Sequence, residues 1–146
     1  MKIFTIGFTK KSAENFFTLL KHTGVKRLID VRLHNISQLA GFTKRDDLRY
    51  FTKTICNIDY AHFPELAPTA DILNAYKKVK NGDWARYEQQ FLNLIQSRHI
   101  EITLSRDVLD RACLLCSEEK PQKCHRRLVA EYLKAHWSDV DIEHIP

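Results

Sequence analysis

The residues best suited to chemistry lie in one stretch, residues 114–133, which reads LLCSEEKPQKCHRRLVAEYL. It contains the thiols of Cys116 and Cys124 and the imidazole of His125. A thiolate is a nucleophile and a metal ligand, and an imidazole is a general base near neutral pH. The stretch therefore fits four kinds of structure: a metal site, a thiol catalyst, an anion pocket, or a core strand and helix that contain Cys.

The second half of the stretch has the pattern of an amphipathic helix that begins near Cys124. Its apolar side chains recur with helical spacing at Leu128, Val129, Tyr132 and Leu133. Cys124 and His125 lie one turn before this stripe, so we expect both on its inner face. A helix N-terminus lowers the pKa of a thiol and attracts anions. This pattern predicts Cys124 as a nucleophile, His125 beside it, and Arg126 as an anion-binding fork.

The elements that must position these residues alternate along the chain. Apolar runs predict strands at residues 2–7, 26–32, 58–63, 112–116 and 140–145, the last of which alternates like an edge strand. Capped or periodic segments predict helices after Ser12, Thr43, Thr69 and Asp83, a helical turn over 105–110, and a helix over 124–137. This alternation predicts one α/β domain over residues 1–146, with a mainly parallel, Rossmann-like sheet flanked by helices.

Polar residues follow the predicted strands, where open parallel sheets form their sites. Glu118 and Asp30 are candidate acids or bases, and Arg32 joins Arg126 as a candidate anion ligand. Further candidates for lining the site are Thr9, Tyr60 and Cys116. We expect Asp30, Arg32, Glu118, Cys124, His125 and Arg126 to converge on one anion-binding pocket. A pairing of Asp30 with Arg126 would instead leave Cys124 packed rather than reactive.

A zinc site would use Cys113, Cys116, Cys124 and His125. The spacing of the first two resembles zinc ligands, but positions three apart on a strand point to opposite faces of the sheet. Cys124 and His125 are adjacent, which makes joint ligation awkward. We therefore expect no metal and no other cofactor.

Composition narrows the possible partners. The 146 residues carry a formal charge of +5, which permits an anionic partner, either a small molecule or a nucleic acid. The opening MKIFTIGFTKK lacks the long apolar core of a signal peptide, and no apolar run is long enough to span a membrane. Four Cys without a signal peptide predict free thiols in a reducing cytoplasm.

The stretch around Cys124 resembles the bacterial family known as domain of unknown function 488 (DUF488). The family pattern is Leu-Cys-x-Glu, then Pro, then Cys-His-Arg and a helix with Ile or Val before Ala. The matching positions are Cys116, Glu118, Pro121, Cys124, His125, Arg126, Val129 and Ala130. Elsewhere the resemblance covers TIGFT, Asp30–Val31–Arg32, Tyr60 before PEL, Trp84 with Tyr87, and the closing EHI.

The sequence departs from this family at three positions. Phe8 replaces a His, Asn35 a Pro, and Ala67 a Gly. The resemblance implies a compact α/β domain with a polar pocket, and it implies no reaction. Three classes of function remain open: an enzyme acting on an anionic or nucleic-acid-related substrate, a non-catalytic nucleic-acid-binding or DNA-repair-associated module, and a thiol redox or metal-sensing protein.

Overall fold

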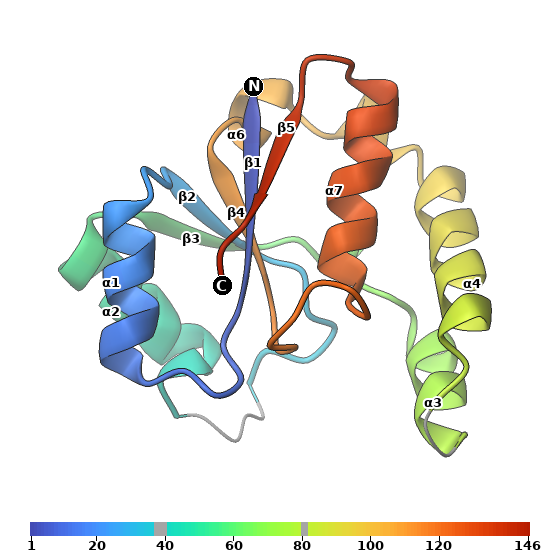
Figure 1. Ribbon diagram of the computed structural model, residues 1–146, viewed down its shortest axis with the longest axis horizontal. Helices are drawn as coiled ribbons and strands as arrows, with labels where there is room; N and C mark the ends of the chain where they lie inside the picture. The colour runs from blue at the N-terminus through green and yellow to red at the C-terminus, as the bar shows by residue number, and fades with distance from the viewer. Residues whose placement is uncertain (37–40, 80–81) are drawn as a thin grey trace.

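The computed structural model describes residues 1–36, 41–79 and 82–146, and it is built around one all-parallel five-stranded sheet (Figure 1). The strands are β1 (Lys2–Gly7), β2 (Arg27–Asp30), β3 (Asp59–His62), β4 (Ala112–Cys116) and β5 (Asp141–His144). Their order across the sheet is β3-β2-β4-β1-β5. The predicted α/β class with a parallel sheet is confirmed, and β5 is an edge strand as its alternation predicted.

Helices cover both faces of the sheet (Figure 1). One face carries α1 (Ala13–His22) and α2 (Arg45–Cys56). The other carries α7 (His125–His136), on which α4 (Trp84–Ser97) packs, and α3 (Ala70–Lys78) packs against α4. The short elements are α5 (Ile100–Thr103), α6 (Arg106–Leu109) and the 3-10 turns η1 (Gly41–Thr43) and η2 (Pro64–Leu66). Among the described residues, no helix has the length and apolarity to cross a membrane.

The central strand β4 fixes which cysteines can meet. All five of its residues are buried, as a strand covered on both faces requires. Cys113 and Leu115 belong to the core against α1 and α2, whereas Leu114 and Cys116 belong to the core against α4 and α7. The predicted opposite facing of Cys113 and Cys116 is thus confirmed.

Most helix starts follow the predicted caps. The side chains of Ser12, Thr69 and Asp83 each accept a hydrogen bond from the backbone N–H three residues later. Helix α7 begins at His125, with Cys124 as its N-cap residue, as predicted. The predicted start at Thr43 is displaced, because this residue lies in η1 and α2 begins at Arg45. The end predicted for the third helix at 81–82 lies partly outside the described residues.

At the end of β1, Gly7 permits the loop after β4 to lie directly on the backbone. A Cβ atom on Gly7 would be 1.6 Å from the backbone oxygen of Glu118 and 3.1 Å from Arg126 Nη1. A backbone oxygen cannot move aside as a flexible side chain can. Glycine at this position therefore sets how closely the loop before α7 approaches the sheet.

We expect Gly7→Ala to lower the free energy of unfolding by about 1–3 kcal/mol, the usual range for overpacking. The measurement is urea denaturation followed by circular dichroism. Gly41→Ala is the matched control, because a Cβ there would meet no heavy atom of the described residues within 4 Å. Equal stability of the two variants would contradict the close approach at Gly7.

Candidate active site

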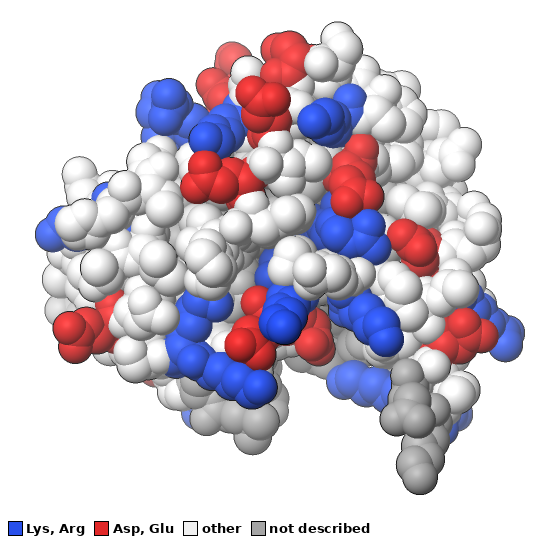
Figure 2. Space-filling model, viewed as in Figure 1, with Lys and Arg blue, Asp and Glu red and all other residues white. Residues whose placement is uncertain are grey.

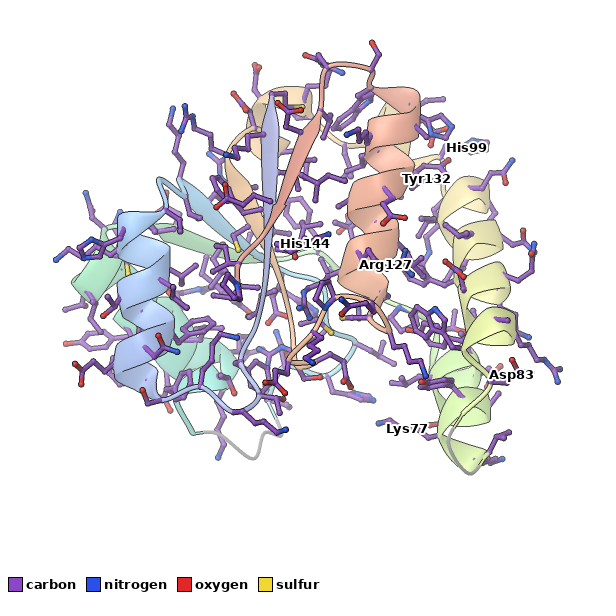
Figure 3. All side chains as sticks on the ribbon, viewed as in Figure 1. Lys77, Asp83, His99, Arg127, Tyr132 and His144 are labelled. Carbon is purple, nitrogen blue, oxygen red and sulfur yellow. The ribbon has the colours of Figure 1, made fainter. Side chains whose placement is uncertain are left out.

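A cleft of about 520 Å³ opens beside the carboxyl ends of β2 and β4. Its walls come from the segments after these strands, the start of α7, and the arm formed by α3 and α4. The surface is hollowed beside this arm (Figure 2), and Lys77 of α3 lies on the side of the arm that faces the sheet (Figure 3). The cleft is therefore where a parallel sheet is expected to carry its site.

The cleft brings together five of the nine residues that the sequence marked: Arg32, Cys116, Glu118, Cys124 and His125. The other four, Thr9, Asp30, Tyr60 and Arg126, do not line it. Thr9, Asp30 and Arg126 instead contact residues of the cleft wall, and Tyr60 contacts Asp30.

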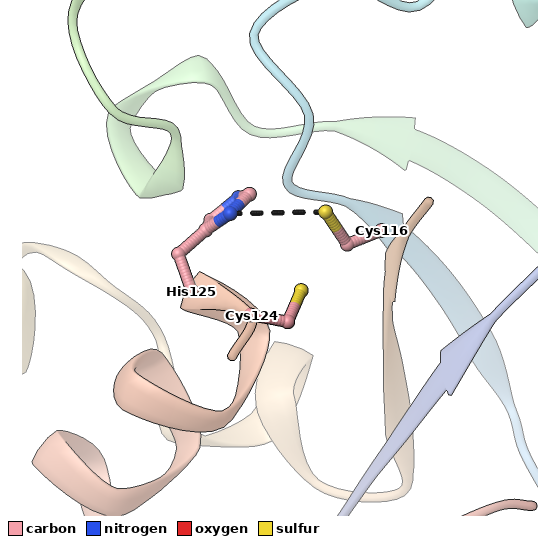
Figure 4. A group of neighbouring side chains, drawn as sticks. All are labelled: Cys116, Cys124 and His125. Carbon is pink, nitrogen blue, oxygen red and sulfur yellow. Dashed lines mark hydrogen bonds between the residues drawn. The ribbon is translucent and has the colours of Figure 1, made fainter. Parts of the chain in front are cut away.

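At the base of the cleft, two thiols and an imidazole meet. The donor atoms of Cys116, Cys124 and His125 all lie within 4.8 Å of one another (Figure 4). Cys116 ends β4, and the other two residues form the start of α7. All three side chains are buried, so small changes in their protonation have large electrostatic effects.

The His125 ring is fixed by the backbone directly after β2, the strand next to β4. Its Nε2 lies 2.6 Å from the backbone oxygen of Val31, and a carbonyl oxygen can only accept a hydrogen bond. Nε2 therefore carries a proton, and Nδ1 faces Cys116 Sγ at 3.7 Å. The Phe91 ring and the imidazole pack edge to face, with centroids 5.3 Å apart. In this geometry Nδ1 can take a proton from the Cys116 thiol.

The pKa values of Cys116, Cys124 and His125 are shifted in different directions. The hydrogen bond from Cys124 lowers the pKa of Cys116 well below its usual value despite burial, and the charges of His125 and Arg126 act in the same direction. Burial and the neighbouring Cys116 raise the pKa of Cys124. Burial alone would lower the pKa of His125, but Cys116 and the Val31 carbonyl raise it. These directions favour the form in which a Cys116 thiolate accepts from a protonated Cys124 and faces an imidazolium.

The Arg126 side chain holds the loop between β4 and α7 through a hydrogen bond to its backbone. It is fully buried, and its Nη1 donates to the backbone oxygen of Glu118 at 2.7 Å. The Thr9 hydroxyl donates to the backbone oxygen of Ser117 at 2.6 Å, from the other side of the loop. Arg126 and Thr9 thus both contact backbone carbonyls of this loop, and the charge of Arg126 acts on the cleft through its field.

Arg32 is held in the cleft wall by Asp30. Its Nε and Nη2 donate to the two carboxylate oxygens of Asp30 at 2.8 and 2.6 Å, and its Nη2 also donates to the backbone oxygen of Thr43 at 2.8 Å. The Tyr60 hydroxyl donates to Asp30 at 2.6 Å, and Asn35 donates to that hydroxyl. Asp30 therefore pairs with Arg32 and not with Arg126, and both of its oxygens are engaged.

Glu118 is the exposed carboxyl at the cleft wall. Desolvation of the carboxyl by its neighbours and the charge of Cys116 raise the pKa of Glu118, while Arg126 and His125 act in the opposite direction. A carboxyl with a raised pKa exchanges protons closer to neutral pH than an ordinary one. Glu118 is thus placed to serve as a second acid or base.

The opposite wall is aromatic, and little in the sequence indicated it. Tyr76, Trp84 and Tyr87 line the cleft, with the Trp84 and Tyr87 rings stacked at 5.1 Å. Their helical spacing is that of core residues, and Tyr87 is indeed buried. Lys77 and Lys123 also line the cleft. The sequence feature that could have indicated this wall is Lys77 next to Tyr76 on α3. Many surface helices carry a basic residue beside an aromatic one, so this feature is not specific.

Three of the four proposed zinc ligands lie together, and Cys113 is on the other face of the sheet. Two sulfurs and one imidazole nitrogen are donors that soft ions such as Zn²⁺ accept. A closed structural zinc site needs four ligands, and the group found in the described part of the chain has three. The expected absence of a metal therefore stays a prediction.

Fold and site together define an α/β protein with an all-parallel sheet and a paired thiol and imidazole in a cleft at its carboxyl edge. The chain belongs to the family described as domain of unknown function DUF488, whose model matches residues 12–133. The match includes the Cys-His-Arg block, whereas TIGFT and EHI lie outside it. Comparisons with curated proteins and with solved structures found no match.

Proposed function

We propose that this protein is an enzyme that uses Cys116 as a thiolate nucleophile on a small anionic substrate. The observation that carries the proposal is the position of His125, whose Nε2 is engaged by Val31 O while Nδ1 faces Cys116 Sγ. A nucleophile, a base and a group that orients the base are the parts of cysteine-dependent catalysis.

The proposed reaction is group transfer at an electrophilic carbon. The Cys116 electron pair forms a carbon–sulfur bond, the bond to the leaving group breaks, and the His125 imidazolium gives that group its Nδ1 proton. Water then attacks the thioester or related intermediate while His125 takes its proton, and the released sulfur returns to the thiolate. Cys124 stabilises that thiolate with its S–H. Every proton taken up by His125 is thus returned in the cycle.

These roles differ from those expected from the sequence, where Cys124 was the nucleophile and Cys116 a binding residue. Cys124 carries the raised pKa of the pair, so it suits the donor role. Glu118 remains a candidate acid or base at the cleft wall. Asp30 has both oxygens occupied, so we assign it the positioning of Arg32.

The proposal is tested by where an electrophile reacts first. With substoichiometric iodoacetamide at pH 7, we expect Cys116 to carry most of the label when peptides are quantified by mass spectrometry. Cys116→Ser should remove that label, and His125→Gln should slow it, without change at Cys56 on α2. Preferred labelling of Cys124 or Cys56 would overturn the assignment of the nucleophile.

The nucleic-acid-binding alternative has less support from the surface. On the face seen in Figure 2, Lys and Arg alternate with Asp and Glu and form no continuous basic track. Several basic side chains pair with acidic ones, as in Lys10–Glu119, Arg106–Asp139 and Arg127–Glu131. A nucleic-acid interface needs basic groups along one surface for phosphate contacts. The charge distribution therefore favours a small anion in the cleft.

The closeness of the two thiols favours one second candidate, a redox- or metal-responsive protein. Cys116 and Cys124 are free thiols with sulfurs within 4.8 Å. Mass spectrometry after mild oxidation would reveal a Cys116–Cys124 disulfide, and elemental analysis would reveal a metal. One zinc per chain in the purified protein, lost in Cys124→Ser, would replace the enzyme proposal by this one.

A further inference from the structure

We propose that the cleft binds a phosphorylated planar ring of about the size of a mononucleotide, with the phosphate on Arg32 and the ring on the aromatic wall. This inference deepens the proposed function and rests on it for placing the reactive carbon beside Cys116. Binding itself requires only the cleft, so the two can be tested separately.

The phosphate end is indicated by an unused donor on Arg32. The side chain is 4% exposed and lines the cleft. Its Nε and Nη2 are engaged by Asp30 and Thr43, but its Nη1 is buried and meets no acceptor in the described part of the chain. A buried N–H without an acceptor costs about 1–3 kcal/mol, which a ligand oxygen would recover. Arg126 also has a buried nitrogen, Nε, without a partner among the residues that the structure describes, but its side chain does not line the cleft.

The charge of the lining favours a dianion over a neutral group. Lys77 and Lys123 line the cleft in addition to Arg32, and His125 faces Cys116 with a raised pKa. Glu118 is the acidic side chain among the lining residues that the structure describes. Asp30 neutralises part of the Arg32 charge from behind, and this pairing fixes the guanidinium plane. A fixed plane with one donor left over is suited to a phosphate oxygen.

The ring end is indicated by the aromatic wall. Tyr76 and Trp84 are half-buried, with ring centroids 6.0 Å apart, and Trp84 stacks on Tyr87 at an interplanar angle of 23°. Ring surface that is left open in a cleft stacks on planar ligands, and for nucleobases each such contact contributes about 1–3 kcal/mol. The cleft volume of about 520 Å³ lies within the range of small-molecule sites and exceeds what phosphate alone would fill.

The test compares a whole ligand with its two parts on the Cys116→Ala variant, which keeps the cleft and lacks the proposed nucleophile. The probes are AMP, adenosine and inorganic phosphate, measured by isothermal titration calorimetry. We expect AMP to bind at least tenfold more tightly than either part. If phosphate equals AMP, the ring contact is overturned, and if adenosine equals AMP, the phosphate contact is overturned.

Two variants then locate the contacts. Arg32→Lys keeps a cation beside Asp30 but loses the fork, so we expect a loss of at least tenfold in AMP affinity with adenosine unchanged. Trp84→Leu should weaken AMP and adenosine together and leave phosphate unchanged. Arg106→Lys, at a surface ion pair with Asp139, is the control and should change nothing.

If Arg32→Lys does not fold, Trp84→Leu and the three probes still decide the question. Failure of all three probes to bind, with Cys116 still labelled first by iodoacetamide, would overturn the ligand and leave the enzyme proposal standing. Tight AMP binding with no preference for Cys116 would support the ligand and overturn the enzyme.

Discussion

Alkylation of Cys116 by iodoacetamide should slow much less between pH 8 and pH 6 than alkylation of an ordinary thiol. An ordinary thiol with a pKa of about 8.5 loses about 75-fold in thiolate fraction over this range. The pKa of Cys116 is lowered by the S–H of Cys124 and by the charges of His125 and Arg126. Its thiolate therefore persists as the pH falls, until the pH passes below that lowered pKa.

The internal reference is Cys56, whose pKa is raised by burial, so its rate should fall steeply with pH. The comparison uses the change of each labelling rate with pH and not the absolute rates. The reason is that a thiol with a lower pKa is also a weaker nucleophile. Cys124→Ala removes the donor and should restore a steep profile at Cys116, whereas Cys124→Ser keeps a donor and should restore it only in part. A Cys116 profile that parallels Cys56 would rule out the thiolate.

Loss of the Asp30 carboxylate should cost about 3–5 kcal/mol of the free energy of unfolding, because it leaves a buried guanidinium without its partner. Asp30 is fully buried and accepts from Arg32 and Tyr60. The measurement is urea denaturation of Asp30→Ala beside Asp46→Ala, since Asp46 pairs with Arg45 at the surface. Exposed pairs contribute little, so the control should match the parent protein.

A double variant separates the buried charge from lost packing. Asp30→Leu combined with Arg32→Met removes both charges and keeps much of the volume, so it should regain a large part of the lost stability. If the double variant is no more stable than Asp30→Ala, the cost arises from packing. Equal stability of Asp30→Ala and Asp46→Ala would instead show that the buried pair does not stabilise the fold.

The sheet could be predicted from the sequence because its strands are short apolar runs between turn and cap signals. All five strands begin and end within two residues of the predicted positions. The order β3-β2-β4-β1-β5 was not predicted, since it depends on packing between distant segments. Helix α5 was also missed, because the break before it rests on His99, which has a positive φ of 53° that no local pattern indicates.

The site was predicted as a set of residues but not as an arrangement. The helix-start pattern located Cys124 and His125, yet it could not show that His125 faces Cys116. That contact depends on how Arg126 and Gly7 seat the loop against the sheet. The aromatic wall was not predicted, because Trp84 and Tyr87 have the spacing of core residues. Whether such a side chain is buried or lines a cleft depends on what packs above it, which the spacing does not show.

The place of β4 in the sheet has a consequence for folding during synthesis. β1 pairs with β4 and β5, and β2 pairs with β3 and β4, so β1 and β2 share no ladder. Until residues 112–116 leave the ribosome, the nascent chain holds an isolated β1 and a separate β2–β3 pair with open edges. Such long-range closure folds slowly and exposes unpaired strands to aggregation. Because Cys116 ends the strand that joins these pieces, the thiol site can form only after residues 112–116 have been synthesised.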